Sequence, residues 1–475
     1  MQAGSGDDGG DDIIPEPIIN IDNYLTIEAL ENGLTASLSI NTCEYCIDGD
    51  NNWKTLSAET ATKSINIGHT VSFRGELTPI PSNGIGTFTI SKKCNLKGNC
   101  MSMLFGDNAA NNYSLSNKIN AFYGLFRGCT TIKSAENLVL PATTLASYCY
   151  QNMFYNCSSL TTAPELPATT LAPYCYQNMF CNCSSLTTSP ELPATALAGS
   201  CYRYMFSGCT SLTTAPELPA TTLVPGCYSF MFYGCTNLTT SPALPATTLA
   251  SYCYQDMFRR CTSLTTAPEL PATALAGYCY DAMFYNCSSL TTAPELPATT
   301  LAESCYEYMF YNCSKLKNIT MLATNINATG CLSEWVSGVA SIGTFTKAST
   351  MTSLPTGTNG IPNGWTVVDH DGEESGGSSL NLVIDYNNLT QNDVDQIINY
   401  MVDNGWTTDN RIDVQVINSN ITVLRRNTEY PITWIIRTDD GFTNGFCLTL
   451  FTTDIIGNTP YFTIDEETLD ITFED

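Results

Sequence analysis

The sequence predicts a mixed α/β solenoid of 26-residue repeats, flanked by an N-terminal β-sandwich and a small C-terminal α+β domain. A 26-residue unit occurs seven times between Leu140 and Met321, and its first copy reads LPATTLASYCYQNMFYNCSSLTTAPE. Self-similarity at this period is typical of solenoids, in which each unit buries its apolar face only against its neighbours. Short alternating apolar runs before the repeats, and an amphipathic stretch with further short runs after them, predict the two flanking domains.

Each repeat is expected to contain one short helix and one short extended segment. The apolar positions of the first copy recur at a spacing of four residues: Leu145, Cys149, Met153 and Cys157. This spacing predicts one buried stripe over about three turns of helix. The Thr-rich segment 160–163 precedes Pro164, and Pro ends or edges a strand because it cannot donate to a ladder. Stacked units therefore predict a leucine-rich-repeat architecture, with a short parallel strand ladder on one side and helices on the other.

Every repeat carries a motif of the form MFxxCxxL, which in the first six repeats is followed by a Pro and then by Leu-Pro; the first copy runs from Met153 to Leu160. The Met-Phe pair returns at residues 179, 205, 231, 257, 283 and 309. This motif resembles the BspA-like leucine-rich repeats of bacterial surface proteins, over about residues 101–368 with a degenerate first and last unit. The resemblance implies adhesion and partner binding. Similar arrays in fibre proteins of phages that infect gut bacteria imply the alternative of a virion appendage.

Changes in composition predict five segments along the chain. They are an acidic disordered leader (1–19), an Ig-like β-sandwich (20–100), the solenoid with its caps (101–368), an acidic Gly/Ser linker (369–379) and a small acidic α+β domain (380–475). Strands of the sandwich are expected at 24–27, 36–40, 71–75 and 86–90. In the last domain we expect a strand at 380–384 and a helix capped by Thr390 and stopped by Asn404-Gly405. Further strands are expected near 413–417, 421–424, 432–436, 446–451 and 461–464.

The net charge of −26 argues against two classes of partner. From Asp369 to Asp475 there are 20 Asp and Glu against four Arg and no Lys, a balance of −16. Such a surface repels nucleic acid and anionic lipid. No stretch approaches the roughly 18 to 20 apolar residues of a membrane span, and no secretory signal follows Met1. The acidic start at 5–17 has two interpretations: the beginning of a mature lipoprotein whose lipid anchor has been removed, or a protein that leaves the cell within a phage particle.

The 22 cysteines are expected to form two ladders rather than a disulfide framework. On a helix, residues eight apart such as Cys149 and Cys157 are about 12 Å from each other, beyond the ~7 Å that a disulfide can bridge. One ladder is Cys149, Cys175, Cys201, Cys227, Cys253, Cys279, Cys305 and Cys331; the other is Cys129, Cys157, Cys183, Cys209, Cys235, Cys261, Cys287 and Cys313. Cys is small and packs well where space is tight, which favours reduced structural ladders. Disulfides between rungs and a metal site are the alternatives.

The residues needed for catalysis are scarce, which predicts a protein that is not an enzyme and needs no cofactor. The two histidines, His69 and His370, fall in the sandwich and the linker, and the glycines form no phosphate-binding loop. The pairs Cys43/Cys46 and Cys94/Cys100 could together form a four-thiolate zinc site, but the longer spacing of the second pair is atypical, and buried or disulfide-linked pairs are the other interpretation. The oxygen-rich run 48–52 lacks the rest of an EF-hand loop and is interpreted as a turn. No metal is therefore expected.

A row of Thr pairs is the main candidate binding surface. Its members are Thr161, Thr162, Thr187, Thr188, Thr213, Thr214, Thr239, Thr240, Thr265, Thr266, Thr291 and Thr292. Beside it runs a row of Glu165, Glu191, Glu217, Glu269 and Glu295, interrupted by Ala243. Hydroxyls repeated at ~4.8 Å would form a flat strip able to dock an extended polysaccharide or peptide. The structural alternative is a Thr ladder that is present only because β-branched residues suit strands.

The positions that differ among repeats lie along the predicted helical edge, for example Arg203-Tyr204 and Arg259-Arg260. Exposed Tyr and Arg are the residue types that carry interface energy, so this edge, with its basic pair Arg259 and Arg260, is a second candidate surface. The alternative is that these are solvent positions where sequence drift costs little.

Together these patterns predict non-enzymatic recognition or adhesion outside the cell, on a bacterial surface or a phage virion. The expected partner is an extracellular protein or polysaccharide, and neither nucleic acid nor a membrane span is expected. The alternative is a phage fibre in which the solenoid is a spacer of about 35 to 45 Å and a terminal domain binds.

Overall fold

The computed structural model describes residues 20–370, except 59 and 82, and six strands between residues 412 and 473. The chain divides into two compact units, Met1–Asp371 and Gly372–Asp475. The strands of the second unit are β13 (Ile412–Ile417), β14 (Asn420–Arg425), β15 (Ile432–Arg437), β16 (Cys447–Thr452), β17 (Phe462–Ile464) and β18 (Ile471–Phe473). The first four form one antiparallel sheet in chain order, and β17 pairs with β18.

These strands confirm five predicted ones in the second unit. The predicted strand at 380–384 and the predicted helix from Thr390 lie outside the described residues, as do the leader and most of the linker. The α+β domain as a whole is therefore not confirmed.

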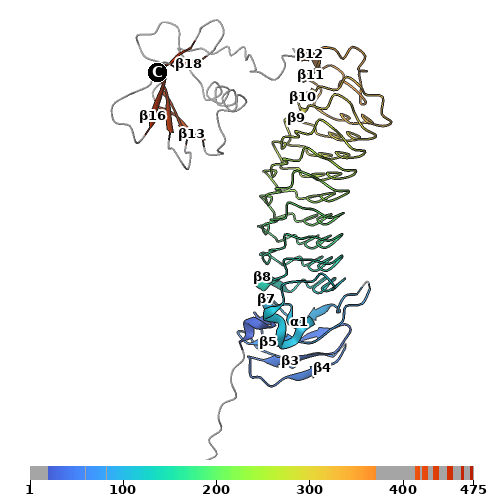
Figure 1. Ribbon diagram of the computed structural model, residues 1–475, viewed down its shortest axis with the longest axis vertical. Coiled ribbons are helices and arrows are strands. Elements are labelled where there is room, and N and C mark those ends of the chain that lie inside the picture. Colours follow the sequence, from blue (N-terminus) through green and yellow to red (C-terminus); the bar gives the residue numbers. More distant parts are fainter. Residues whose placement is uncertain are drawn as a thin grey trace, which may run out of the picture. The chain divides into compact units, whose positions relative to one another are not determined.

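The N-terminal part of the first unit forms a sheet that continues into the solenoid (Figure 1). Its strands are β1 (Leu25–Ala29), β2 (Ala36–Leu38), β3 (Cys43–Ile47), β4 (Lys54–Leu56), β5 (Thr70–Arg74), β6 (Phe88–Ile90), β7 (Cys94–Asn99) and β8 (Ile132–Val139). Six of them form one sheet in the order β4-β3-β5-β1-β7-β8, and β2 pairs separately with β6. Short helical segments accompany them: η1 (Ile21–Asn23), α1 (Ser102–Phe105) and η2 (Gly106–Asn111).

The four strands predicted before residue 100 are confirmed, but the predicted β-sandwich is not. Only the short β2–β6 pair lies apart from the main sheet. The edge of that sheet is extended by β8, which pairs in parallel with β7 and belongs to the first rung of the solenoid. The sheet and the rungs therefore share one hydrophobic core, which runs from Leu25 to Trp365.

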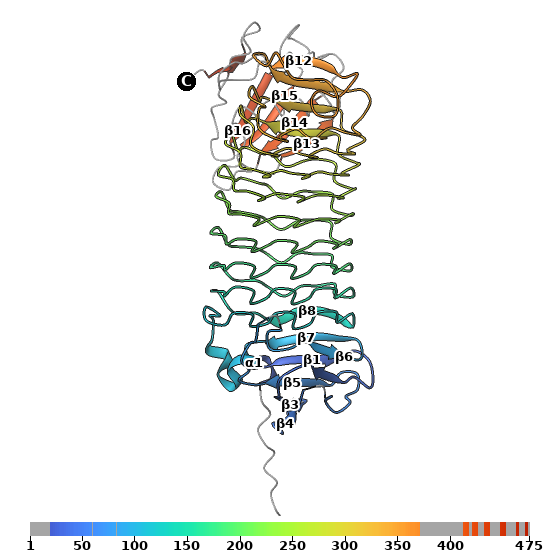
Figure 2. The ribbon, with the colours of Figure 1, turned by 90° about the vertical axis from the view of Figure 1, so that its right-hand side faces the viewer.

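The rungs of the solenoid consist of successive turns, and the helix predicted in each repeat is wrong (Figure 2). In the first repeat Tyr148, Asn152 and Asn156 have φ values of 61°, 58° and 62°. An α-helix requires φ near −63° at every residue, so a left-handed residue at every fourth position closes a turn instead of continuing a helix. One such turn takes four residues, close to the 3.6 of a helix. The apolar spacing is therefore nearly the same for both structures.

The turns of each rung form what we call the turn segment, residues 148–157 in the first repeat. Along it the backbone N–H groups donate alternately within the rung and to the next rung. The N–H of Gln151 donates to Tyr148 of the same rung, whereas the N–H of Tyr150 donates to Cys175 of the next rung. The same alternation continues at Asn152, Met153, Phe154, Tyr155, Asn156 and Cys157. Every second N–H thus links neighbouring repeats, which fixes their register along the whole array.

The interior of the stack consists of columns of identical side chains. Tyr150 stacks on Tyr176 with ring centroids 5.6 Å apart, and Phe154 stacks on Phe180 at 5.5 Å. The columns end at Trp335, which is fully buried against Tyr306 and Phe310. Offset stacking of this kind adds to the free energy gained by burying the rings.

On the other side of each rung the backbone is extended, and in most rungs it pairs with the neighbouring rungs only through isolated β-bridges. Single parallel bridges join Ser134 to Thr162, Thr214 to Thr240 and Thr266 to Thr292. A continuous parallel sheet forms at the last rungs, in the order β12-β11-β10-β9. Its strands are β9 (Thr292–Leu296), β10 (Asn318–Met321), β11 (Thr344–Ala348) and β12 (Thr366–His370). The predicted parallel pairing is confirmed, although most rungs contribute a bridge rather than a strand.

The left-handed turn positions yield the first testable prediction. A Cβ added at Gly234, where φ is +72°, would meet nothing within 4 Å, and one added at Gly199 would meet only the carbonyl of Pro225 at 3.9 Å. Both sites have room for Ala, but only Gly234 is left-handed. Gly234→Ala should lower the free energy of unfolding by about 1 kcal/mol, and Gly199→Ala should leave it unchanged or raise it slightly. Urea unfolding of both variants measures the difference; equal effects would contradict the turn structure.

Candidate functional site

The candidate site is the extended side of the six central rungs, which we call the groove face. It comprises residues 161–170, 187–196, 213–222, 239–248, 265–274 and 291–300. Each stretch begins with a Thr pair and contains two prolines, and five of the six contain one Glu between those prolines. All five Glu side chains are exposed, whereas the Leu and Ala residues that flank the second Pro are buried in the core. Burial of these apolar residues anchors the backbone and turns the Glu side chains to solvent.

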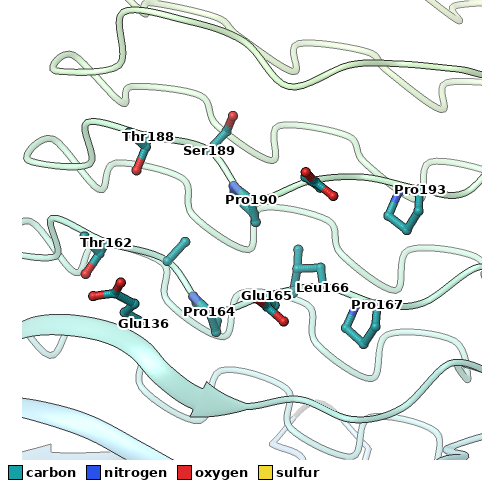
Figure 3. A pocket seen from close by; sticks show the side chains of 12 residues that line it. Glu136, Thr162, Pro164, Glu165, Leu166, Pro167, Thr188, Ser189, Pro190 and Pro193 are labelled. Atoms are coloured by element: carbon teal, nitrogen blue, oxygen red, sulfur yellow. The ribbon is translucent and has the colours of Figure 1, made fainter.

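Shallow grooves lie between adjacent rungs of this face (Figure 3). The first groove is lined by Thr162, Pro164, Glu165 and Pro167 of one rung and by their equivalents in the next rung, with Glu136 at its lower edge. The next groove is lined by Glu191 and Glu217 with their neighbouring prolines. Glu191 therefore borders two successive grooves.

Proline explains why the rungs separate here. A Pro has no N–H, so Pro164 and Pro167 cannot donate to a ladder between rungs. Where a rung lacks these prolines, as in β10, the ladder closes: β10 pairs with β9 and with β11, and the N–H of Leu322 donates to Leu296. The grooves thus follow from two prolines repeated every 26 residues.

The structure places the predicted Thr residues together on this face. Eleven of the twelve are exposed, and Thr162 is half-buried. Several hydroxyls of the first column donate to carbonyls of the preceding rung: Thr161 to Lys133 at 2.9 Å, Thr187 to Thr161 at 3.4 Å and Thr239 to Thr213 at 3.3 Å. Those hydroxyl hydrogens stabilise the stack, so the first Thr of these pairs offers chiefly acceptor lone pairs to a ligand. A binding role of the Thr row stays a prediction.

Arg259 and Arg260 lie in the turn segment, not on the groove face. Arg259 forms an ion pair with Asp256 at 3.0 Å and sits over the ring of Tyr285 at 4.0 Å. Arg260 occupies a left-handed position with φ of 65°, and its guanidinium lies 5.8 Å from the ring of Tyr233. The predicted helical edge is therefore a turn edge, and Arg259 is engaged in structural contacts there.

Next to this ion pair, Asp281 is partly buried and lies near two other carboxylates. Burial raises the pKa of its carboxyl to about 7; the Gln255 side chain donates to it at 2.9 Å and opposes the shift. The nearby carboxylates of Asp256 and Glu307 raise the pKa further, and Arg259 lowers it. Sequence reasoning missed this residue because the shift depends on which side chains meet across rungs.

The described cysteines are free and buried, so the inter-rung disulfides considered from the sequence are absent from residues 20–370. In the second ladder the thiol of Cys183 donates to the carbonyl of Phe154 at 3.1 Å, and Cys157, Cys209, Cys235, Cys261, Cys287 and Cys313 make the equivalent bond. Burial raises the pKa of Cys149 and Cys313 to about 12.

The two cysteine pairs of the N-terminal sheet do not converge. Cys43 and Cys46 are on β3 and Cys94 is on β7, and β5 and β1 lie between these strands. Within the described residues no cluster of three or more His, Cys, Asp and Glu is placed to hold a metal ion. Asp48 of the oxygen-rich run accepts from the Thr70 N–H at 2.8 Å and from His69, as expected of a turn.

One comparison with known proteins gives a match. The family model described as BspA type leucine rich repeat region matches residues 101–239, 174–292 and 229–357, in six copies. Neither a curated protein nor a solved structure matches the chain.

The thiol ladders predict slow chemical modification. At pH 8 the cysteines of residues 20–370 should react with iodoacetamide far more slowly than in urea, because burial both shields the thiols and raises their pKa. Peptide mass spectrometry of protein alkylated before and after unfolding measures this. Rapid native labelling of the ladder peptides, or disulfide-linked peptides among them, would contradict the structure.

The raised pKa of Asp281 predicts a pH dependence of stability. Below pH 3.8, the ordinary pKa of Asp, this carboxyl is neutral in both the folded and the unfolded protein, so its contribution to the free energy of unfolding is fully present. That contribution is lost as the pH rises through the folded-state pKa of about 7. Because Asn does not ionise, the Asp281→Asn variant should have a free energy of unfolding higher than that of the parent protein by on the order of 2 kcal/mol at pH 8. At pH 4 the two proteins should differ little. Urea unfolding at both pH values measures this, with Glu303→Gln as an exposed control. A pH-independent difference would contradict the account.

Proposed function

The chain belongs to the BspA-type leucine-rich repeat family, and from this premise we propose that it is a non-enzymatic recognition or adhesion protein displayed outside the cell. Its groove face docks an extracellular protein or polysaccharide. Proteins of this family are often surface adhesion proteins and are usually surface-associated or secreted, which supports the proposal.

One observation carries the choice of surface. Two successive grooves lie between the first three rungs of an exposed face, and the prolines that border them recur in all six stretches. Binding surfaces of solenoids are extended and built from equivalent positions of successive repeats. The turn side lacks this regularity, since its residues are occupied by stacked rings and by the Arg259–Asp256 ion pair.

The chemistry of the described residues supports a role in binding rather than catalysis. The His69 ring lies 2.6 Å from the Asp48 carboxylate at an exposed turn. The buried thiols have raised pKa values, whereas an activated thiol nucleophile needs a lowered one. Among the described helices, none is long and apolar enough to cross a bilayer.

A phage fibre or virion appendage is the second candidate. The single core from Leu25 to Trp365 and the fixed register of its rungs favour a stiff spacer, in which case a terminal domain binds the partner. Both candidates share the fold and differ in which part of the chain touches the ligand.

Two changes to the full chain separate these candidates. The double substitution Thr214→Trp and Thr240→Trp places bulky side chains on exposed neighbouring rungs of the groove face, and Glu303→Trp places one on the turn side. We expect the first variant to lose at least tenfold in affinity for a partner found on a printed panel of extracellular matrix proteins and polysaccharides, and the control to bind normally. Removal of residues 192–243, which are two whole repeats, should weaken binding similarly. Full binding by both the blocked and the shortened chain would establish the spacer.

A further inference from the structure

We propose that the groove face accepts an extended basic polypeptide segment, whose Lys or Arg side chains enter the grooves between rungs. This inference rests on the proposed function and names the partner of the same face.

The charge of the face is of one sign. Its six stretches contain five Glu and no Asp, Lys, Arg or His. Residues 20–368 as a whole contain 20 Asp and Glu against 15 Lys and Arg, so the rest of this part of the chain adds no net positive charge. A partner that meets this face with positive charge gains Coulomb energy, whereas an anionic glycan is repelled.

The grooves give each cation carboxylates on two sides. The first groove lies among Glu136, Glu165 and Glu191, and the second lies between Glu191 and Glu217. The walls are proline rings, against which the apolar stem of a Lys or Arg side chain can pack while its charged end reaches the carboxylates. A planar guanidinium can bind such carboxylates through two parallel hydrogen bonds.

Acceptors outnumber donors among the hydrogen-bonding groups of the face, where the remaining exposed Thr hydroxyls can both donate and accept. The prolines contribute carbonyls without N–H groups, the Glu carboxylates only accept, and the hydroxyls of Thr161, Thr187 and Thr239 donate inward to the preceding rung. A partner rich in donors matches this excess of acceptors. Lys supplies three and Arg five, and neither accepts.

These features favour a polypeptide over a neutral polysaccharide. Sugar rings present flat apolar faces that stack on aromatic side chains, and the six stretches contain no aromatic, Asn, Gln or Arg side chain. An extended polypeptide places every second side chain on one face at about 6.7 Å, and rungs repeat at about 4.8 Å. Long, flexible Lys and Arg side chains accommodate that difference.

The fourth rung offers a natural test, because Ala243 stands where the other five stretches have Glu. It divides the carboxylate row into a group of three and a group of two. Ala243→Glu completes the row and should strengthen binding of a basic segment several-fold, which loss of structure cannot mimic.

The experiment measures binding of the full chain to a peptide of about ten residues of alternating Lys and Thr, a length that spans six rungs. Peptides with Gln or Glu in place of Lys, and a cationic oligomer of glucosamine, are the comparisons. The parent chain should bind the Lys peptide with an affinity that falls as salt is added. Glu191→Gln with Glu217→Gln should weaken binding roughly tenfold. The control variant Glu76→Gln with Glu303→Gln removes the same charge from exposed positions outside the groove face and should bind normally.

If the groove variant and the control variant lose the same affinity for the Lys peptide, the effect comes from net charge alone and the inference is overturned. The inference is also overturned if Ala243→Glu does not raise the affinity. Binding of the glucosamine oligomer but not of the Lys peptide would overturn the choice of a polypeptide. These outcomes leave the proposed function standing if Thr214→Trp with Thr240→Trp still blocks a partner from the panel. Undiminished binding by that blocked variant would overturn the proposed function itself.

Discussion

The alternation of backbone hydrogen bonds along the turn segment is the constraint on which the rest of the solenoid depends. Because every second N–H donates to the next repeat, the backbone atoms of each rung must lie directly over the equivalent atoms of its neighbour. That requirement fixes a left-handed residue at every fourth position of the segment and keeps the repeat at 26 residues. The stacked rings and the thiol ladder follow, because identical side chains then lie directly above one another.

The two sides of a rung differ because proline interrupts this bonding on only one of them. On the turn side the ladder is complete, and side chains such as Arg259 and Tyr285 use the surface for contacts between rungs. On the groove face the prolines leave neighbouring rungs joined by isolated bridges at most, and grooves edged by carboxylates lie between the first three of these rungs. The turn side thereby stabilises the stack, and the groove face is the segment to which we assign recognition in the proposed function.

Much of this could be predicted from the sequence. The period, the burial of the two cysteine ladders, the parallel pairing at the Thr row and most strands of the flanking parts follow from spacing and residue type. The helix prediction was wrong because the spacing of four residues between Cys149, Met153 and Cys157 fits a series of four-residue turns as well as a helix. The informative signal was the recurrence of Asn and Gly, the two residue types that best tolerate a positive φ, at position 156 and at all but one of its equivalents: Asn182, Gly208, Gly234, Asn286, Asn312 and Gly338, with Arg260 as the exception. The Glu row was visible in the sequence, but the grooves were not, since they depend on hydrogen bonds that prolines prevent.

The central claim, that partners meet the groove face, is tested most directly by carboxyl footprinting of the full chain. Carbodiimide coupling of glycine ethyl ester labels exposed carboxylates and is read by peptide mass spectrometry, with and without a bound partner from the panel. The account predicts protection of Glu165, Glu191, Glu217, Glu269 and Glu295, with unchanged labelling of Glu303 on the turn side. Unchanged labelling of all five groove carboxylates, with protection only in the flanking parts of the chain, would contradict it and make the solenoid a spacer.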